Sequence, residues 1–287
     1  MENEISRNAL PIKDEAKDFY GKVCTEQPQG DELLVLSRGP FSSGCDKQDY
    51  GSSDGSARDF DVLKLYKEAR PSIVYFQMKG VTEAGGKGPA NKEFSWGGSG
   101  FIIEAENGKS LVLTDNHVVA GTGMDSKVKV NETKVVLSNG EVLDAKIVSA
   151  DPSRDLALVE IDTGDKTKDI DPIEIPETMV NPEGSPALVS FGQPYTSHTI
   201  YTSEGTADRI VKRSDFNRVI KPLDGEDPNR PMLVMMLPVR TGFSGAAVLD
   251  KDGKAIGVVD LETSPFSSLA TPINKQVIQE LKSKRNE

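Results

Sequence analysis

Residues 241–259 read TGFSGAAVLDKDGKAIGVV, and the rest of the chain is interpreted around this stretch. Gly242 and Gly245 flank the pair Phe243-Ser244 and allow the backbone to turn sharply, because glycine has no Cβ. Such a turn exposes the hydroxyl of Ser244 and aims the N–H groups of Gly242 and Ser244 at one point, which predicts a nucleophile with an oxyanion hole. An ordinary turn that leads into a strand has the same pattern. Whether Ser244 is a nucleophile therefore depends on whether the chain supplies catalytic partners for it.

The same stretch continues as a predicted β-hairpin. Residues 246–250 and 255–260 are apolar strands, and the segment 251–254 between them contains the turn signal Asp252-Gly253. We therefore expect Ser244 at the mouth of a hairpin.

The composition excludes several classes of partner. The 287 residues carry a formal net charge of −11, so the chain lacks the cationic surface that nucleic acids and anionic membranes attract, and we expect neither as a partner. No apolar run reaches about 18 residues, so no membrane span is expected. Two histidines and two cysteines are too few for a typical zinc site. We expect no metal and no cofactor.

Residues 1–58 mix polar residues and glycine with apolar islands such as residues 33–36. We expect an N-terminal extension, 1–58, with little regular structure apart from one short strand. The first residues lack the basic and apolar regions of a signal peptide, which leaves open a cytosolic chain or one whose signal was removed. A disulfide between Cys24 and Cys45 would require an oxidising compartment.

From residue 59 onwards the pattern is that of short elements separated by turns. Val62, Leu65, Tyr66 and Ala69 recur at helical spacing and predict a helix that ends before Pro71. Strands follow at 73–78, 100–104, 110–114, 134–138, 141–149, 156–161, 187–191, 199–213, 232–237 and 269–271, with a polar loop at 82–96. This regular spacing predicts an antiparallel barrel or sandwich, and the acidic, proline-containing segment 162–184 connects two halves.

A closing helix is predicted after the last strand. Thr271-Pro272 supplies its N-cap and first turn, and Ile273, Val277 and Leu281 form its apolar stripe.

A serine nucleophile needs a base, normally an imidazole that is oriented by a carboxylate. The chain has two histidines: His117 follows an apolar strand, and His198 lies in a polar segment. His117 is the better candidate for the base, because a turn of helix at the strand end would hold its ring at the rim of a sheet. Asp155 directly precedes the apolar strand 156–161 and is the candidate acid, although aspartates before strands also serve as turn formers.

The order of the three residues separates the known classes of serine hydrolase. His117, Asp155 and Ser244 follow the order of the double-barrel proteases. The α/β-hydrolases place the histidine after the serine, and no histidine follows Ser244. The order of subtilisin would need His198 after an acid, and the strand-rich pattern argues against that fold.

Six blocks together resemble the HtrA/Deg-type trypsin-like serine proteases. In order they are GGSGFII, LVLTDNHVVAGTG, DPSRDLALVEID, FGQPYTSHTIYTSEGTA, TGFSGAAVLDKDGKAIGVV and LATPINKQVIQEL. The resemblance implies an all-β fold of two perpendicular six-stranded antiparallel β-barrels, 59–182 and 183–287, with a short N-terminal helix and a C-terminal helix. It also implies a triad of His117, Asp155 and Ser244, with the N–H groups of Gly242 and Ser244 as the oxyanion donors.

The sequence departs from the family pattern at three places. Phe243 stands where the family usually has asparagine, so the hydrogen bonds of the loop must differ. Ala246 replaces a second glycine, a change between small residues that we expect to be tolerated. The sequence stops just after the closing helix, so we expect no PDZ domain, a module common in this family.

The resemblance implies a serine endopeptidase that acts on extended polypeptides, and the alternative is a catalytically silent scaffold that binds peptides in the cleft. In this fold the expected substrate pocket comprises Val239, Val258, Val259, Leu261 and Leu269, which predicts cleavage after small aliphatic residues. Pro238 stands where trypsin has its pocket aspartate, while Glu262 could attract a basic side chain. We expect a periplasmic or secreted protein, with the cytoplasm as the alternative; the oligomeric state is not readable from the sequence.

Overall fold

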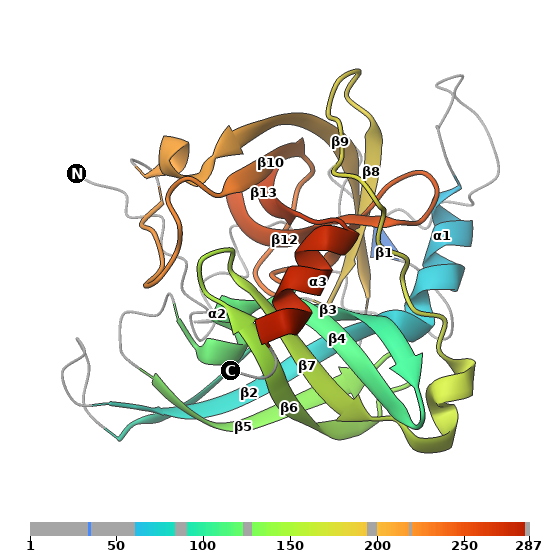
Figure 1. The fold of residues 1–287 in the computed structure, drawn as a ribbon, viewed down its shortest axis with the longest axis vertical. Helices are drawn as coiled ribbons and strands as arrows, with labels where there is room; N and C mark the ends of the chain where they lie inside the picture. Colours follow the sequence, from blue (N-terminus) through green and yellow to red (C-terminus); the bar gives the residue numbers. More distant parts are fainter. Residues whose placement is uncertain are drawn as a thin grey trace.

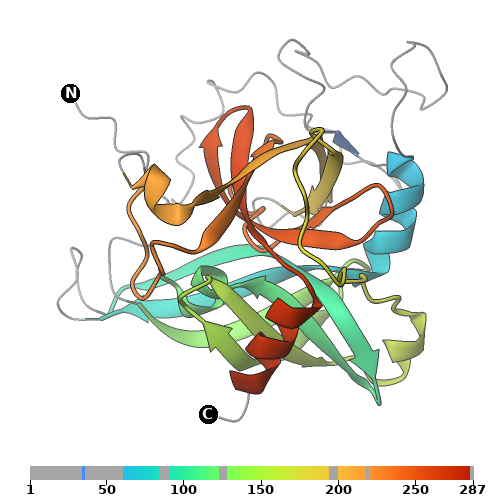
Figure 2. The same cartoon turned by 45° about the horizontal axis from the view of Figure 1, so that its top comes forward.

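The computed structural model describes residues 34–35, 61–83, 91–122, 128–193, 200–217 and 220–284. Figures 1 and 2 show two β-barrels, one above the other, with the first drawn in cyan to green and the second in yellow to red. The all-β prediction with two antiparallel six-stranded barrels is confirmed. None of the helices in this part of the chain has the length and apolar character needed to cross a membrane.

The first barrel closes in the order β2-β3-β4-β7-β6-β5. Its strands are β2 (Ile73–Thr82), β3 (Glu93–Glu106), β4 (Lys109–Asp115), β5 (Val128–Leu137), β6 (Val142–Asp151) and β7 (Leu156–Asp162). Alternate residues of these strands, such as Val74, Phe76, Val112 and Val159, fill the interior and are fully buried.

The second barrel runs in the order β9-β10-β13-β12-β11-β8 and is closed by the pairing of β8 with β9. Its strands are β8 (Ala187–Gly192), β9 (Tyr201–Lys212), β10 (Pro231–Met236), β11 (Ala247–Leu249), β12 (Ala255–Ser264) and β13 (Ser267–Pro272). A short strand of the N-terminal extension, β1 (Leu34–Val35), pairs in parallel with β9 opposite Tyr201 and Thr202. The rest of the extension, with Cys24 and Cys45, lies outside the described residues.

One apolar cluster joins the two barrels. It contains Phe101 and Leu158 from the first barrel, Leu249 and Val258 from the second, and side chains of both terminal helices. Because this cluster is continuous, it fixes the position of one barrel against the other.

The N-terminal helix α1 (Val62–Ala69) buries the four residues that the sequence predicted, and it is followed by the 3-10 turn Arg70–Ser72. The predicted loop 82–96 is too long. Strand β3 already begins at Glu93, because Phe94 and Trp96 pair with β2. Their rings stack with centroids 5.1 Å apart.

The closing helix begins later than predicted. Helix α3 runs Lys275–Ser283, and Asn274 is its N-cap, accepting the N–H of Val277 at 3.0 Å. Thr271 and Pro272 still belong to β13, and Ile273 donates its N–H to Ile256 at 3.0 Å. The N-cap prediction at Thr271 is therefore wrong, since strand pairing holds this segment extended. Helix α3 returns to the first barrel, where Ser149 of β6 donates to the carbonyl of Leu281 at 2.6 Å (Figure 1).

Candidate active site

The predicted base and acid lie at the ends of two neighbouring strands of the first barrel. His117 is in the short helix α2 (Asn116–Ala120), which begins where β4 ends, and Asp155 directly precedes β7. Strands β4 and β7 pair along their length, so these two ends are adjacent. Asp155 has a left-handed backbone with φ of 59°, and its carbonyl accepts the N–H of Asn116 at 3.1 Å.

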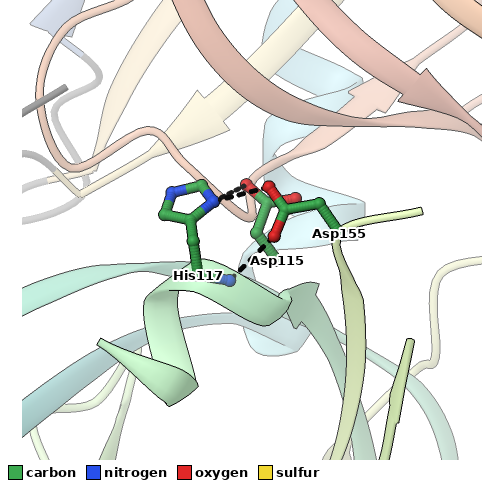
Figure 3. Close-up of side chains that lie close together, drawn as sticks. All are labelled: Asp115, His117 and Asp155. Carbon is green, nitrogen blue, oxygen red and sulfur yellow. Dashed lines mark hydrogen bonds and ion pairs between the residues drawn. The ribbon is translucent and has the colours of Figure 1, made fainter. Parts of the chain in front are cut away.

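Both carboxylate oxygens of Asp155 contact His117 (Figure 3). Oδ1 accepts the backbone N–H of His117 at 2.8 Å, and Oδ2 lies 2.7 Å from Nδ1 of the ring. The side chain of Asp155 is 1% exposed and that of His117 is 21% exposed. This arrangement favours the tautomer with its proton on Nδ1 and makes Nε2 the proton acceptor, as a serine base requires.

A second buried carboxylate, which the sequence analysis did not identify, belongs to the same cluster. Oδ2 of Asp115 lies 3.9 Å from Nδ1 of His117. Burial raises the pKa of Asp115 well above its usual value, and the negative charges of Asp155 and Asp260 raise it further, against smaller opposing effects of Arg230 and the Gly245 N–H. The Asp115 carboxyl therefore holds its proton more tightly than an exposed aspartate does.

The ligand atoms of Asp115, His117 and Asp155 all lie within 4.8 Å of one another. Bringing them onto one cation would break the contact between Nδ1 and Asp155, so the arrangement fits the predicted pair of base and acid better than a metal site.

The loop that carries Ser244 faces this cluster from the second barrel. Gly98 of β3 lies between the two, since a Cβ at this position would be 2.7 Å from Val118 of α2 and 3.0 Å from the carbonyl oxygen of Ser244. The fold therefore brings Ser244 next to the helix of His117.

The backbone of this loop forms a type II turn. The N–H of Phe243 donates to the carbonyl of Arg240 at 2.9 Å, and Gly242 at the third position has φ of 101°, which only glycine adopts readily. The N–H groups of Gly242 and Ser244 donate to no other residue of the described part of the chain. They are thus available as the predicted oxyanion donors.

The hydroxyl of Ser244 is hydrogen-bonded within the second barrel, where it donates to the backbone carbonyl of Asp260 at 3.1 Å. The pairing of β12 with β13 skips Asp260, because Val259 pairs with Ala270 and Leu261 with Leu269. Such a bulge re-aims the backbone of the extra residue, here its carbonyl toward the serine.

Phe243, the residue that departs from the family pattern, is an apolar anchor. Its ring is fully buried in the core of the second barrel, in contact with Gly192, where a Cβ would come within 2.8 Å of the ring. Burial of an aromatic ring thus holds the loop at the position where asparagine would have made local hydrogen bonds.

All five residues of the expected substrate pocket are buried. Val239 and Val259 pack with Phe243 in the core of the second barrel, and Leu261 and Leu269 pack in a neighbouring cluster. Val258 belongs to the cluster between the barrels, since consecutive residues of a strand point to opposite faces. The pocket assignment stays a prediction. His198, the other histidine, lies outside the described residues.

Comparison with known proteins identifies the family of this chain. A family model described as "Trypsin-like peptidase domain" matches residues 98–258. The "Serine protease Do-like HtrA" of Bacillus subtilis is 25% identical over 246 residues, which cover 81% of this chain and 50% of that protein. The "Serine protease HTRA1B" of Danio rerio is 28% identical over 281 residues, covering 94% and 52%. The "Periplasmic serine endoprotease DegP" of Salmonella typhimurium is 29% identical over 188 residues, covering 61% and 34%.

Solved structures show the same fold. The active form of the Rv3671c protease from M. tuberculosis superposes with a TM-score of 0.55 at 17% identity, covering 77% of this chain and 83% of that one. The serine endoprotease from Yersinia pestis superposes with a TM-score of 0.51 at 20% identity, covering 77% and 65%.

The two closed barrels are the fold of the trypsin-like peptidases, and this chain belongs to the trypsin-like peptidase family. Within it, the relatives named above are of the HtrA and DegP type. The chain spans about half the length of these curated relatives or less.

Proposed function

We propose that this chain is a serine endopeptidase that hydrolyses peptide bonds through an acyl-enzyme on Ser244. The observation that carries the proposal is the double contact of Asp155 with His117, through the backbone N–H and through Nδ1. A carboxylate that holds both the backbone and the ring of one histidine determines the direction in which Nε2 points. That control is what general-base catalysis by an imidazole requires.

The residues would act as follows. His117 Nε2 takes the hydroxyl proton of Ser244 as the oxygen attacks the scissile carbonyl, and Asp155 stabilises the imidazolium. The N–H groups of Gly242 and Ser244 bind the oxyanion, and His117 then gives the proton to the leaving amine. A water molecule then attacks the acyl-enzyme while His117 accepts its proton. His117 returns this proton to the Ser244 oxygen, and the new carboxylate is released.

The contact between the Ser244 hydroxyl and the Asp260 carbonyl suggests how substrate starts this sequence. We expect the substrate to lie extended along the edge of β12 beyond Gly257 and to pair through its backbone. A substrate N–H that bonds to the Asp260 carbonyl competes with the serine hydroxyl for that oxygen. Substrate binding would thus release the hydroxyl toward His117.

The proposed specificity is for small aliphatic residues before the scissile bond, such as Val, Ala, Ile or Leu. Discrimination between neighbouring aliphatics should be only about 10- to 200-fold, because one methylene in an apolar pocket contributes roughly 1–3 kcal/mol. Desolvation raises the pKa of the Glu262 carboxyl, and the charge of Arg240 opposes this shift. We propose extended or unfolded polypeptides as the substrates. We also propose a periplasmic or secreted location, because one relative is named a periplasmic endoprotease.

A fluorophosphonate probe tests the enzyme against the silent scaffold. Labelling of Ser244 that disappears in the His117→Ala variant supports the endopeptidase, whereas a folded protein that never reacts supports the scaffold. Cleavage-site profiling in a mixture of unfolded proteins tests the specificity. A dominant Lys or Arg before the cut would contradict the apolar pocket and point to Glu262.

A further inference from the structure

A buried group of charged side chains lies behind the triad, on the side of the second barrel. The side chains of Arg213, Glu226, Arg230 and Asp260 are each at most 2% exposed. Arg213 Nε and Arg230 Nη2 both contact Oε1 of Glu226, at 2.7 and 2.5 Å. The trypsin-like mechanism itself uses none of these four side chains.

Arg230 reaches further than Arg213. Its Nη2 lies 2.5 Å from Oδ2 of Asp260, and its Nη1 donates to Thr271 Oγ1 at 2.6 Å and to the carbonyl of Arg154 at 3.0 Å. Arg213, by contrast, donates hydrogen bonds to Asn217 and to the backbone carbonyls of Ile220 and Lys221. The contacts of Arg230 thus connect this group to the residues around the triad.

The two ends of the Arg230 contacts lie next to catalytic atoms. Arg154 immediately precedes Asp155, whose carboxylate orients His117. Asp260 supplies the carbonyl on which the Ser244 hydroxyl rests. One planar guanidinium therefore holds the backbone beside the catalytic acid and the side chain of the bulged residue beside the nucleophile.

Stability alone is a weak reason for such a group. Removing charges from water costs several kcal/mol for each ion, and apolar replacements of buried ion pairs are often neutral or stabilising. Burial lowers the pKa of Arg230, but the negative charges of Asp260, Asp155 and Glu226 outweigh it and raise the pKa above the usual value. Arg230 thus stays charged at every working pH.

The charged and titratable groups around His117 come from four elements. Asp115 lies at the end of β4, Asp155 at the start of β7, Asp260 in β12, and Arg230 just before β10. Arg230 is the cation among them, and it acts on both Asp115 and Asp155. Its charge therefore opposes the negative charge of the buried carboxyl groups in this cluster.

We propose that Arg230 is a positioning residue for the triad: it fixes Asp155 and Asp260 and balances the negative charge at His117. This inference rests on the proposed peptidase function. It predicts that changing the charge balance moves the pH at which His117 becomes an effective base, in opposite directions for Arg230 and Asp260.

The experiment measures the rate at which a fluorophosphonate labels Ser244 of the full chain as a function of pH. The acid midpoint is the pH, on the acidic side, at which this rate is half of its maximum. In Arg230→Met, loss of a positive charge favours the imidazolium, so the acid midpoint of the rate should rise by about one pH unit, and the maximal rate should fall. In Asp260→Asn, loss of a negative charge should lower the midpoint by a similar amount, about one unit. Arg230→Lys keeps the charge and should hold the midpoint near that of the wild type while the maximal rate falls.

Arg213→Met is the matched control, because Arg213 is equally buried and contacts the same oxygen of Glu226. We expect it to destabilise the fold without moving the midpoint. An equal shift in Arg213→Met, or midpoints that stay fixed or move the same way in Arg230→Met and Asp260→Asn, would overturn the inference.

If Arg230→Met does not fold, Asp260→Asn and Arg230→Lys decide by the same criteria. A wild-type chain that folds but never reacts with the probe would overturn the proposed function itself. A wild type that reacts while no variant shifts the midpoint would overturn only the role of Arg230.

Discussion

The hydroxyl of Ser99 donates to the carbonyl oxygen of Gly242 at 2.7 Å and so joins strand β3 of the first barrel to the nucleophile loop of the second. The same hydroxyl accepts the N–H of Gln193 at 3.0 Å. The N–H of Ser99 donates to the carbonyl of Ser244 at 2.7 Å. Ser99 of the opposite barrel therefore holds the loop that carries the predicted oxyanion donors.

Ser99→Ala should lower kcat about tenfold. The substitution leaves the Gly242 carbonyl and the Gln193 N–H buried without their partner, and each unsatisfied group costs roughly 1–3 kcal/mol. Steady-state kinetics on a fluorogenic peptide would measure the loss, with Ser190→Ala as control, since Ser190 donates to Ala247 at 2.8 Å away from the loop. Equal losses of kcat in both variants would contradict a specific hold on the loop.

Gly245→Ala should abolish activity and destabilise the fold. A Cβ at Gly245 would lie 2.0 Å from the Ser99 carbonyl oxygen and 2.3 Å from Thr114 Oγ1, and its φ is 87°. Gly140 has nearly the same φ, 86°, so an alanine there would have similar backbone strain, but no atom lies within 4 Å of the added Cβ. Gly140→Ala should therefore cost only about 1–2 kcal/mol in urea unfolding, and Gly245→Ala clearly more. Similar values for the two would show that the contact with Ser99 is unimportant.

Phe243→Asn should lower stability by about 3–5 kcal/mol, even though it restores the residue usual in the family, because it empties an apolar site and buries an amide there. Phe266→Asn is the matched control, since Phe266 is 50% exposed and its loss should change little. Thermal unfolding of the two variants would compare them. A stable and active Phe243→Asn protein would argue against the apolar anchor.

Asp115 should make the fold less stable as pH rises. Its folded pKa is raised, so the folded protein binds this proton more tightly than the unfolded chain does. The stabilisation is complete below the unfolded pKa of about 3.9 and is lost as pH rises toward the folded value. Asp115→Asn should therefore gain stability relative to wild type in urea unfolding as the pH rises above about 4.

Asp151 provides the opposite control. Burial alone would raise its pKa, but Ser153, Lys284 and Arg154 outweigh it and lower the pKa. Asp151→Asn should therefore be less stable than wild type above about pH 4, where the ionised aspartate stabilises the fold, and the difference should shrink in acid. If the free energies of unfolding of Asp115→Asn and wild type changed in parallel with pH, the raised pKa of Asp115 would be contradicted.

The triad should behave as a unit. Ser244→Ala and His117→Ala should each remove roughly 10⁴-fold or more of kcat, and the double variant should be little worse. Asp155→Asn should also be severe, because it selects the wrong ring tautomer. His198→Ala is the control and should be mild. Loss of activity in His198→Ala with activity retained in His117→Ala would reverse the assignment of the base.

The sequence alone determined the features that depend on local patterns and on scarce residue types. The helical spacing of Val62, Leu65, Tyr66 and Ala69 predicted α1, and Asp252-Gly253 predicted the hairpin turn, where Gly253 has φ of 78°. His117 is one of two histidines, so the sequence could select it as the candidate base from its place after a strand and from the order of the three residues.

Only the tertiary structure decided how the site is held. Arg230, Asp260 and Ser99 look like ordinary polar residues in the sequence, and their roles come from contacts that span 30, 76 and 143 positions. The start of α3 was misplaced for a related reason, since strand pairing keeps Thr271 and Pro272 extended. Local patterns predict elements because backbone preferences act within a few residues, whereas burial of a charge or a ring is determined by segments that meet only when both barrels have closed.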